Sequence, residues 1–349
     1  MLEDRVFQSV DLTARAIEQR ADAHWIIAFS GGKDSTAALK IFLAATRRAS
    51  CAFPRATIIY CDTGVENPVL DIYAKRLLRQ LSDEFDADGV PISVQCLKAP
   101  PEDRFFVRLI GRGYPPPTNS FRWCTTALRI RPVSRFIAAN DPRDTVVVLG
   151  LRGSESQQRD RSIARSADRY WQKQREGRGD YDLFLPIIDL DVPEVWDAVF
   201  AFAKPRCIDP HALETLYRDA SGECPVIKAP QAPPCASGRF GCWTCTVVRK
   251  DKSARQLIQS GYPELQPFLA FRDWLSEIRN DPDRRWPLRR NGTAGMGPLT
   301  LDTRREILAR IDDLEVETRS TILDSDERGL IASLWRFDDT ARLSFPSRP

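Results

Sequence analysis

The sequence predicts an α/β protein built on a parallel sheet. Apolar strand-like runs alternate with helical stretches through the first half of the 349-residue chain, and those runs are continuously apolar. Strands of that kind are buried on both faces, as in parallel sheets that helices cover. A glycine-rich turn follows the first run, and ligands of such sheets bind beyond the carboxyl ends of the strands.

The individual elements follow from the apolar patterns. We expect strands at 25–29, 57–60, 92–96 and 145–150, with helices at 36–47, 67–85 and 125–140. Residues 152–182 are polar and lack apolar periodicity, so they predict a mobile loop, and "LPIIDL" and "DVPEVWDAVFAF" within 183–202 predict a strand and a helix. The remaining expected elements are a helical stretch at 253–279, an irregular segment at 284–298, a helix at 302–318 and a weakly patterned tail.

These elements divide the chain into three parts. Residues 1–215 hold the predicted sheet, 216–280 a cysteine-rich segment and a helix, and 281–349 a basic and mostly helical C-terminal region. The net charge is only +3, so any contact with nucleic acid must come from local clusters of basic residues. The first residues carry acids, and no stretch approaches the ~20 apolar residues of a membrane span, so we expect a cytoplasmic protein without membrane contact.

The segment "FSGGKDST" at 29–36 has the composition of a phosphate-binding turn. Glycines let backbone N–H groups approach an anion, and the helix that follows adds its positive end, which Ser35 and Thr36 can cap. It is not a Walker A loop, because Asp34 stands where that motif has its metal-binding hydroxyl, and it lacks the dinucleotide pattern Gly-x-Gly-x-x-Gly. The candidate nucleotide-binding residues here are Phe29, Ser30, Gly31, Gly32, Asp34, Ser35 and Thr36.

Two further segments follow predicted strands and face the same crevice. "YCDTGVENP" at 60–68 offers Tyr60 and Asp62, and Asp62 is suited to a cation or a ribose, although an acidic turn of this kind also serves as a helix cap. "GLRGSESQQR" at 150–159 adds the remaining candidates for phosphate or sulfate binding, which are Gly150, Arg152 and Arg159.

A thiol opens the predicted helix after 120. In "SFRWCTT" at 120–126, Arg122 and Cys124 lie at the helix start, where the helix dipole and a nearby cation stabilise a thiolate. The alternative interpretation is that Cys124 is a small buried residue.

These motifs carry a family resemblance. Ser-Gly-Gly-x-Asp-Ser resembles the PP-loop of ATP pyrophosphatases, which split ATP between its α and β phosphates and form an adenylated intermediate. SGGKDS, CDTGVENP, the RWC helix start, GLRGSES and "LPIID" before "EVW" occur in an order similar to PAPS-reductase-like PP-loop proteins. Within that group, "ECPVIKAPQAPPCASGRFGCWTCTVVRKDKS" followed by "FLAFRDWL" resembles the DndC-like and SspD-like sulfurtransferases of bacterial DNA phosphorothioation systems, over residues 24–275.

The resemblance implies a fold, cofactors and partners. The fold is the adenine nucleotide α-hydrolase-like PP-loop domain, the nucleotide is ATP with Mg²⁺, and the cofactor is a [4Fe–4S] cluster. Implied partners are DNA, a cysteine desulfurase and other proteins of the phosphorothioation system. The chain is shorter than expected of the double-strand systems, and residues after 280 resemble no segment of the family.

The cysteines indicate a metal site. Four of the nine crowd into 22 residues, namely Cys224, Cys235, Cys242 and Cys245, and Cys242-Trp-Thr-Cys245 has the spacing at which two sulfurs bind one site. Four thiolates suit Zn²⁺ or a [4Fe–4S] cluster equally, and the resemblance favours the cluster. The expected ligands are Cys124, Cys235, Cys242 and Cys245, with Cys224 as the alternative. A Cys124 outside the cluster would instead carry a persulfide.

The implied reaction places ATP over the first strand. A DNA phosphate oxygen attacks the α-phosphorus, pyrophosphate leaves, and persulfide sulfur then displaces AMP. The expected catalytic residues are Lys33, Asp34, Asp62, Arg152 and Cys124, and Arg159 adds to the cations that offset developing charge.

A basic segment is the candidate DNA contact. Residues 284–301 contain Arg284, Arg285, Arg289 and Arg290 with Trp286 among them and no acid in the segment before 302. Arginines beside an aromatic suit single-strand phosphates and bases. Residues 152–178 are the alternative, although acids there offset the arginines.

Three other functions fit parts of the pattern. A PAPS or adenylylsulfate reductase would share the crevice, but such enzymes use a cysteine near the C-terminus, and none follows Cys245. A tRNA thiolase also adenylates a nucleic acid. A non-enzymatic scaffold would bind ATP and a cluster and dock a desulfurase, without turnover.

Overall fold

The structure is a computed structural model that describes residues 2–139, 144–153, 169–174, 181–221 and 240–342. Its contacts group the chain into two compact units that do not follow chain order. Unit 1 comprises Met1–Cys61, Pro68–Leu97 and Val133–Phe240. Unit 2 comprises Asp62–Asn67, Lys98–Pro132 and Gly241–Pro349. The three-part division expected from the sequence stays a prediction.

Unit 1 is built on a six-stranded sheet with the strand order β3-β2-β1-β4-β6-β5. Its strands are β1 (His24–Ala28), β2 (Ala56–Asp62), β3 (Ile92–Lys98), β4 (Thr145–Leu149), β5 (Trp171–Gln174) and β6 (Tyr181–Phe184). β1 pairs in parallel with β2 and β4, β4 pairs in parallel with β6, and β5 is antiparallel to β6. The predicted parallel α/β fold is confirmed.

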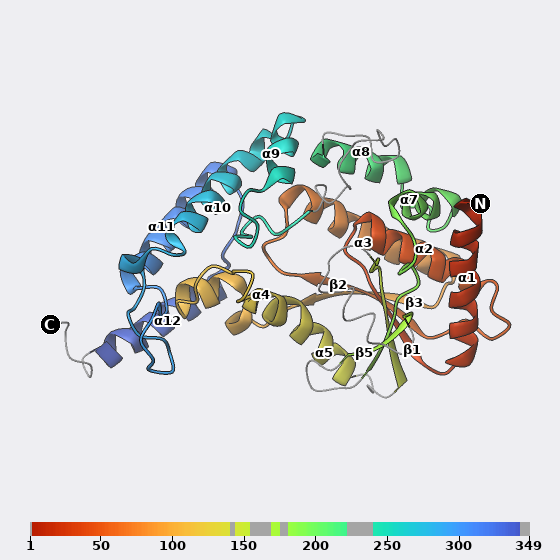
Figure 1. The fold of residues 1–349 in the computed structure, drawn as a ribbon, viewed down its shortest axis with the longest axis horizontal. Helices are drawn as coiled ribbons and strands as arrows, with labels where there is room; N and C mark the ends of the chain where they lie inside the picture. Colours follow the sequence, from red (N-terminus) through yellow and green to blue (C-terminus); the bar gives the residue numbers. More distant parts are fainter. Residues whose placement is uncertain (1, 140–143, 154–168, 175–180, 222–239, 343–349) are drawn as a thin grey trace. The chain divides into compact units, whose positions relative to one another are not determined.

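Helices cover both faces of this sheet (Figure 1). Those of unit 1 are α1 (Leu2–Gln19), α2 (Lys33–Thr46), α3 (Pro68–Asp88), α5 (Arg131–Ala138), α7 (Val192–Ala201) and α8 (Pro210–Ser221). Trp25 and Ile27 point into a core that they share with α1, α2, α3 and α7, whereas Ile26 points to the opposite face, with Ile137 of α5. Alternate side chains of one strand therefore enter different cores, which explains the continuously apolar strand sequences.

Several boundaries differ from the sequence prediction. Segment 152–182 is not a loop throughout, because its last part contains β5 and the start of β6. The expected strand "LPIIDL" at 185–190 consists of turns after β6, although Leu185 and Ile187 are fully buried. An apolar run indicates that a segment is buried. It does not indicate strand pairing, because turns can be buried as well. α2 begins at Lys33 rather than 36 with Gly32 as its N-cap, so the expected capping by Ser35 and Thr36 is wrong.

Unit 2 is mostly helical. Its helices are η1 (Pro101–Asp103), η2 (Val107–Gly111), α4 (Trp123–Thr125), η3 (Thr126–Ile130), α9 (Lys252–Gln259), η5 (Pro263–Leu265), α10 (Gln266–Ile278), η6 (Pro282–Arg284), α11 (Leu301–Thr318) and α12 (Ser325–Arg342). The buried side chains of η2, α10, α11 and α12 form one apolar core. The mostly helical C-terminal region is thus confirmed, and α12 occupies part of the tail that is weakly patterned in the sequence. None of the helices in the described ranges is both long and apolar enough for a membrane span.

Candidate functional site

The phosphate-binding turn lies at the carboxyl end of β1 in unit 1. Ser35 braces the turn, because its hydroxyl oxygen accepts the Ser30 N–H at 3.2 Å and donates to the Gly32 carbonyl at 2.9 Å. Gly31 has a φ of +74°, and a Cβ there would lie 3.0 Å from the Ala74 Cβ, so only glycine fits. The turn is therefore closed by its own side chains and by α3.

A charged triplet stands beside this turn. The Asp34 carboxylate accepts a hydrogen bond from Lys33 Nζ at 2.9 Å through one oxygen and from Arg152 Nε at 2.5 Å through the other. Lys33 and Arg152 are only 7% and 8% exposed. Buried cations are costly unless they are paired, so the ion pairs with Asp34 stabilise both at this position. Three of the five residues expected to be catalytic thus come together.

Arg152 reaches Asp34 because β4 lies directly beside β1. The two strands run parallel with Ala28 opposite Leu149, so the turns after them emerge together. A Cβ on Gly150 would lie 2.6 Å from the Asp34 carbonyl oxygen and 2.8 Å from the Ser35 nitrogen. Because Gly150 has no side chain, its backbone lies close to the backbone of Asp34 and Ser35. The segment that carries Arg152 therefore lies against the phosphate-binding turn.

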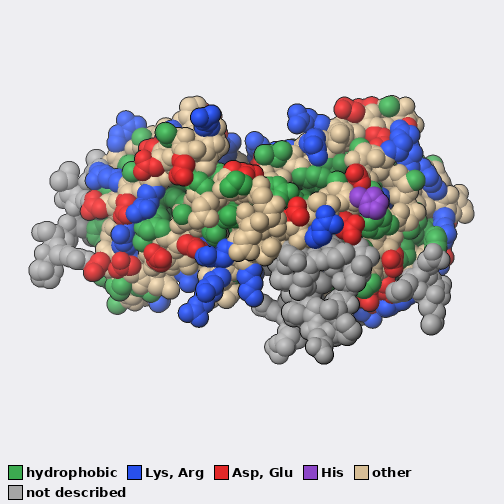
Figure 2. Space-filling model, turned by 90° about the horizontal axis from the view of Figure 1, so that it is seen from above, with side chains coloured by type: hydrophobic (Ala, Val, Ile, Leu, Met, Phe, Trp, Pro, Cys, Tyr) green, Lys and Arg blue, Asp and Glu red, His purple; other side chains and the backbone are tan. Residues whose placement is uncertain are grey.

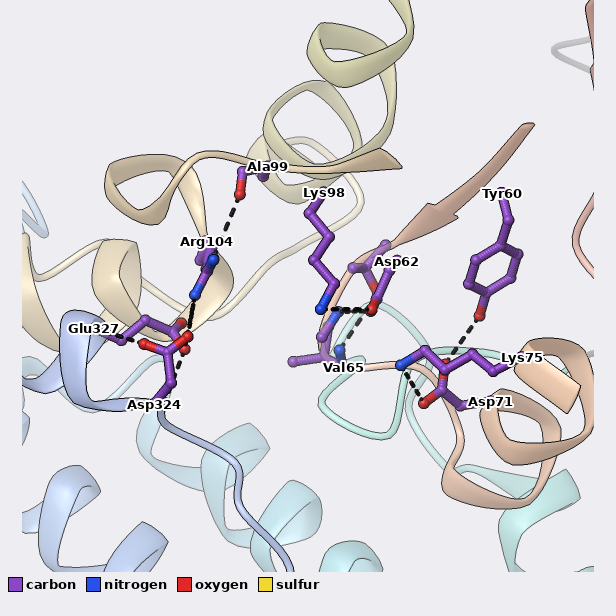
Figure 3. Close-up of polar contacts among 12 residues, drawn as sticks. Tyr60, Asp62, Val65, Asp71, Lys75, Lys98, Ala99, Arg104, Asp324 and Glu327 are labelled. Carbon is purple, nitrogen blue, oxygen red and sulfur yellow. Dashed lines mark hydrogen bonds and ion pairs between the residues drawn. The ribbon is translucent and has the colours of Figure 1, made fainter. Parts of the chain in front are cut away.

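The other predicted nucleotide-binding residues have varied surroundings. Phe29 is buried and its N–H donates to the Ile59 carbonyl, and Thr36 is fully buried within α2. The Tyr60 hydroxyl donates to Asp71, which also accepts from Lys75 at 2.8 Å (Figure 3). Arg159 lies outside the described residues.

Asp62 ends β2 and belongs to unit 2. Its carboxylate pairs with Lys98 Nζ at 3.2 Å and accepts the Gly64 N–H at 3.0 Å; Figure 3 shows Lys98 pointing toward it. The carboxylate is nearly buried while the lysine is mostly exposed. Asp62 thus helps to order the turn that follows β2, and the exposed Lys98 pairs with it there.

Sequence reasoning missed Tyr217 of α8, whose hydroxyl oxygen accepts the Lys33 backbone N–H at 3.1 Å. No local motif marks this tyrosine, because its partner lies 184 residues earlier in the chain.

The described cysteines of the predicted metal site gather in unit 2. The Cys245 N–H donates to the Cys242 carbonyl at 2.9 Å, so the Cys-Trp-Thr-Cys motif forms a tight turn. The turn lies against the acidic segment after β2: Cys242 forms an antiparallel bridge with Glu66, whose carboxylate pairs with Arg129 at 2.8 Å. Cys124 and Cys242 both pack against the apolar core of unit 2.

Two arginines hold this turn from behind. Arg272 of α10 is 1% exposed and donates to the carbonyls of Cys245, Val248 and Arg249. Arg279, the C-cap of α10, donates to the Thr246 carbonyl at 2.5 Å. A segment without regular structure thus has its carbonyls satisfied by guanidinium groups.

Burial disfavours the thiolate form of Cys124 and Cys242. Burial raises the pKa of Cys124, and the nearby Cys245 thiol raises it further. Burial likewise raises the pKa of Cys242, with Glu66 adding to the shift. The expectation that a helix start and Arg122 lower the pKa of Cys124 is therefore wrong for this chain, because burial is the largest influence on that pKa and Arg122 donates to Asn119.

A complete metal-binding set is not visible in the part of the chain that the structure describes. No three histidine, cysteine or acidic side chains there are grouped as ligands of one ion. Cys224 and Cys235, two of the five predicted ligands, lie outside the described residues. Cys124, Cys242 and Cys245 influence one another electrostatically, so the donor set has the chemistry of a thiolate site.

The arginines of 284–290 have partners that the sequence did not reveal. Arg284 pairs with Asp281 and Glu306, so the expectation of no acidic neighbour is wrong for it. Arg285 is 7% exposed and donates to the carbonyls of Gly297, Arg279 and Met296. The contacts of Arg284 and Arg285 are thus made within the folded protein itself.

The other two arginines of this segment remain at the surface. Arg289 and Arg290 are exposed, and the Arg290 guanidinium lies 5.0 Å from the Tyr114 ring centroid. They are the members of the predicted group that a ligand can reach.

The fold and the turn after β1 agree with the family comparison. The phosphoadenosine phosphosulfate (PAPS) reductase domain matches residues 24–248, from β1 through the Cys-Trp-Thr-Cys turn. This chain belongs to the PAPS reductase domain family. The match includes the phosphate-binding turn, Arg152 and both described cysteines of the motif, and it ends before α9.

Individual relatives of this PAPS reductase domain are distant. An uncharacterized protein of Methanocaldococcus jannaschii is 26% identical over 138 residues, which are 38% of this chain and 23% of that protein, so the chain spans under a quarter of the curated relative's length.

Among solved structures, FMN adenylyltransferase from Candida glabrata has a TM-score of 0.39 at 12% identity and covers 90% of this chain and 82% of its own. PAPS reductase from Candida auris has a TM-score of 0.34 at 12% identity over 55% and 78%, and NAD⁺ synthetase from Burkholderia pseudomallei has 0.38 at 16% over 68% and 87%.

The close approach at Gly150 makes a testable prediction for this family member. Gly150→Ala should weaken ATP binding at least about tenfold, because the added methyl meets the Asp34 and Ser35 backbone and overpacking displaces the turn. Titration calorimetry measures the effect. Gly329→Ala is the control: nothing lies within 4 Å of its added methyl in α12, and ATP affinity should not change. Equal affinities for Gly150→Ala and the parent protein would contradict the packing argument.

Proposed function

We propose that this chain is an ATP pyrophosphatase that adenylates a DNA backbone phosphate and transfers sulfur to it. The observation that carries the proposal is the Lys33–Asp34–Arg152 triplet at the carboxyl ends of β1 and β4, in a chain of the PAPS reductase domain family. The proposed reaction also requires a group that can carry sulfur, and the thiols of unit 2 are the candidates for it.

The first step needs positioning and charge neutralisation more than covalent chemistry. A DNA phosphate oxygen attacks the α-phosphorus of ATP, a P–O bond forms, the bond to pyrophosphate breaks, and the backbone phosphate carries AMP. The backbone of Gly31 and Gly32 admits the phosphates closely, while Lys33 and Arg152 offset the charge that develops on pyrophosphate. Mg²⁺, when bound with ATP, shields the phosphates further.

The second step transfers sulfur. A persulfide sulfur, supplied by a cysteine desulfurase, attacks the adenylated phosphorus and AMP leaves. A second thiol then attacks the carrier sulfur, so that the S–S bond breaks, the phosphorothioate keeps its sulfur, and the two protein thiols end as a disulfide that a thiol reductant must reopen. Cys124 is the proposed carrier if it is not a cluster ligand, and the second thiol is then one outside the cluster, because Cys242 and Cys245 are proposed to bind it.

The proposed [4Fe–4S] cluster would be held by Cys124, Cys242 and Cys245, with Cys235 or Cys224 as the fourth ligand. The fit rests on the donor set: three described thiols influence one another, and binding to iron offsets the cost of ionising the buried ones. Zinc suits the same thiols. A cluster would supply redox or structural chemistry, and the steps above do not pass through it.

DNA would meet a surface of mixed charge. Basic and acidic side chains are interspersed over the face in Figure 2. We therefore propose that DNA contact is local, through Arg289 and Arg290 beside the half-buried Tyr114 and the exposed Phe121, whose rings are stacked with planes 8° apart.

Product identity tests the ATP step. Parent protein with Mg²⁺, ATP and single-stranded DNA should release AMP and pyrophosphate, and Lys33→Ala and Asp34→Ala should each lower the rate by about 10²-fold, since each removes part of the charged triplet. Chromatography separates the nucleotides. Release of ADP and orthophosphate would contradict the PP-loop mechanism. AMP and pyrophosphate without sulfur in the DNA would favour another adenylating enzyme, and ATP binding without any turnover would favour the scaffold.

Metal analysis tests the cysteine site. Protein purified without oxygen should be brown and contain iron and sulfide, and Cys242→Ser and Cys245→Ser should each lose both. Cys51→Ser and Cys96→Ser are matched controls and should keep the colour, because neither belongs to the thiol group of unit 2. Stoichiometric zinc without iron in such preparations would refute the cluster.

Salt dependence tests the DNA contact. The double variant Arg289→Gln, Arg290→Gln should flatten log affinity against log salt by about one to one and a half units, because single strands contribute about 0.7 per phosphate contact. Arg284→Gln is the control and should leave the slope unchanged, since Asp281 and Glu306 already neutralise that side chain. Unchanged slope in the double variant would direct DNA to the 152–178 segment.

A further inference from the structure

Tyr217 contacts Lys33 in two ways. Its hydroxyl oxygen accepts the Lys33 backbone N–H at 3.1 Å, and Lys33 Nζ lies 4.9 Å from the centroid of its ring. The same hydroxyl stands over the turn, because a Cβ on Gly32 would come within 3.0 Å of it. One side chain from α8 thus fixes both the amide and the ammonium of the lysine.

The tyrosine is itself held rigidly. Trp196 of α7 and Phe240 pack against its ring at centroid distances of 5.5 and 5.1 Å, each with the ring planes 87° apart. Edge-to-face pairs of this kind favour a fixed ring orientation. Burial raises the pKa of Tyr217, so the hydroxyl stays protonated and neutral near pH 7. These contacts give the hydroxyl a defined position above Gly32 and Lys33.

We propose that Tyr217 is a positioning residue that holds Lys33 in the orientation that binds the nucleotide phosphates. This rests on the proposed ATP function of the same turn. Asp34 holds the ammonium from one side through an ion pair, and the tyrosine ring holds it through a cation–π contact. Tyr217 also lies a few residues before segment 222–239, and Phe240 is the first described residue after it. Phe240, on the far side of segment 222–239 in the sequence, therefore contacts the residue that positions Lys33.

A double-mutant cycle tests this role. Tyr217→Phe keeps the ring and removes the hydroxyl, so it should raise the ATP Kd, measured by calorimetry, and lower kcat/KM for pyrophosphate release, each about threefold to tenfold. Tyr217→Leu removes the ring as well, and in a Lys33→Ala background it should alter the ATP Kd less than it does in the parent protein, because the ammonium that the ring contacts is gone. Tyr181→Phe, another buried tyrosine of unit 1, is the matched control and should change neither quantity.

The outcomes separate the two hypotheses. If the parent protein binds ATP and releases pyrophosphate but Tyr217→Phe matches it, or if the effect of Tyr217→Leu on Kd is equally large with and without the Lys33 side chain, the positioning role is wrong and the ATP function stands. If the parent protein binds no ATP, the proposed function fails and the role of Tyr217 fails with it. Thermal unfolding of Tyr217→Phe close to that of the parent protein excludes a general loss of structure as the cause.

Discussion

The candidate site depends on one carboxylate. Asp34 accepts hydrogen bonds from Lys33 and Arg152, two cations that are almost completely buried at the ends of neighbouring strands. Removing one partner of a buried pair costs about 3–5 kcal/mol, because the remaining charge stays desolvated. The same pairing gives the site its chemistry: phosphate oxygens that enter the turn compete with Asp34 for cations that the fold already holds in place.

The sheet explains why such a pairing forms. β1 and β4 are adjacent and parallel, so the residues that follow them emerge at one edge although they are far apart in the sequence. This much was predictable, because continuous apolar runs indicate strands and parallel strands share their carboxyl edge. Helices α1, α8 and α12 were not predicted from local patterns, and "LPIIDL" shows the reason: its apolar residues report burial, which turns satisfy as well as strands do.

Pairs of side chains that are far apart in the sequence could not be predicted at the site. Lys33, Asp34, Arg152 and the Cys-Trp-Thr-Cys spacing were visible because their chemistry is encoded within a few neighbouring residues. Tyr217 was missed because its partner is 184 residues away. The expectation that Arg284 and Arg285 lack partners was wrong for the same reason, since Glu306 pairs with Arg284 and the carbonyl of Gly297 accepts from Arg285 only after folding. A charged residue seen in the sequence can contact a ligand only where folding leaves its side chain exposed.

The cysteine turn shows that the family match alone does not define the site. The match ends at residue 248, yet the turn that carries Cys242 and Cys245 is held by Arg272 and Arg279, which lie beyond it. Hydrogen bonds to charged groups contribute about 1.5–3 kcal/mol each, enough to order a turn that has no helix or strand of its own. Since neighbouring ligands must keep a fixed spacing to share one metal centre, α10 is as much a part of the proposed cluster site as the thiols themselves.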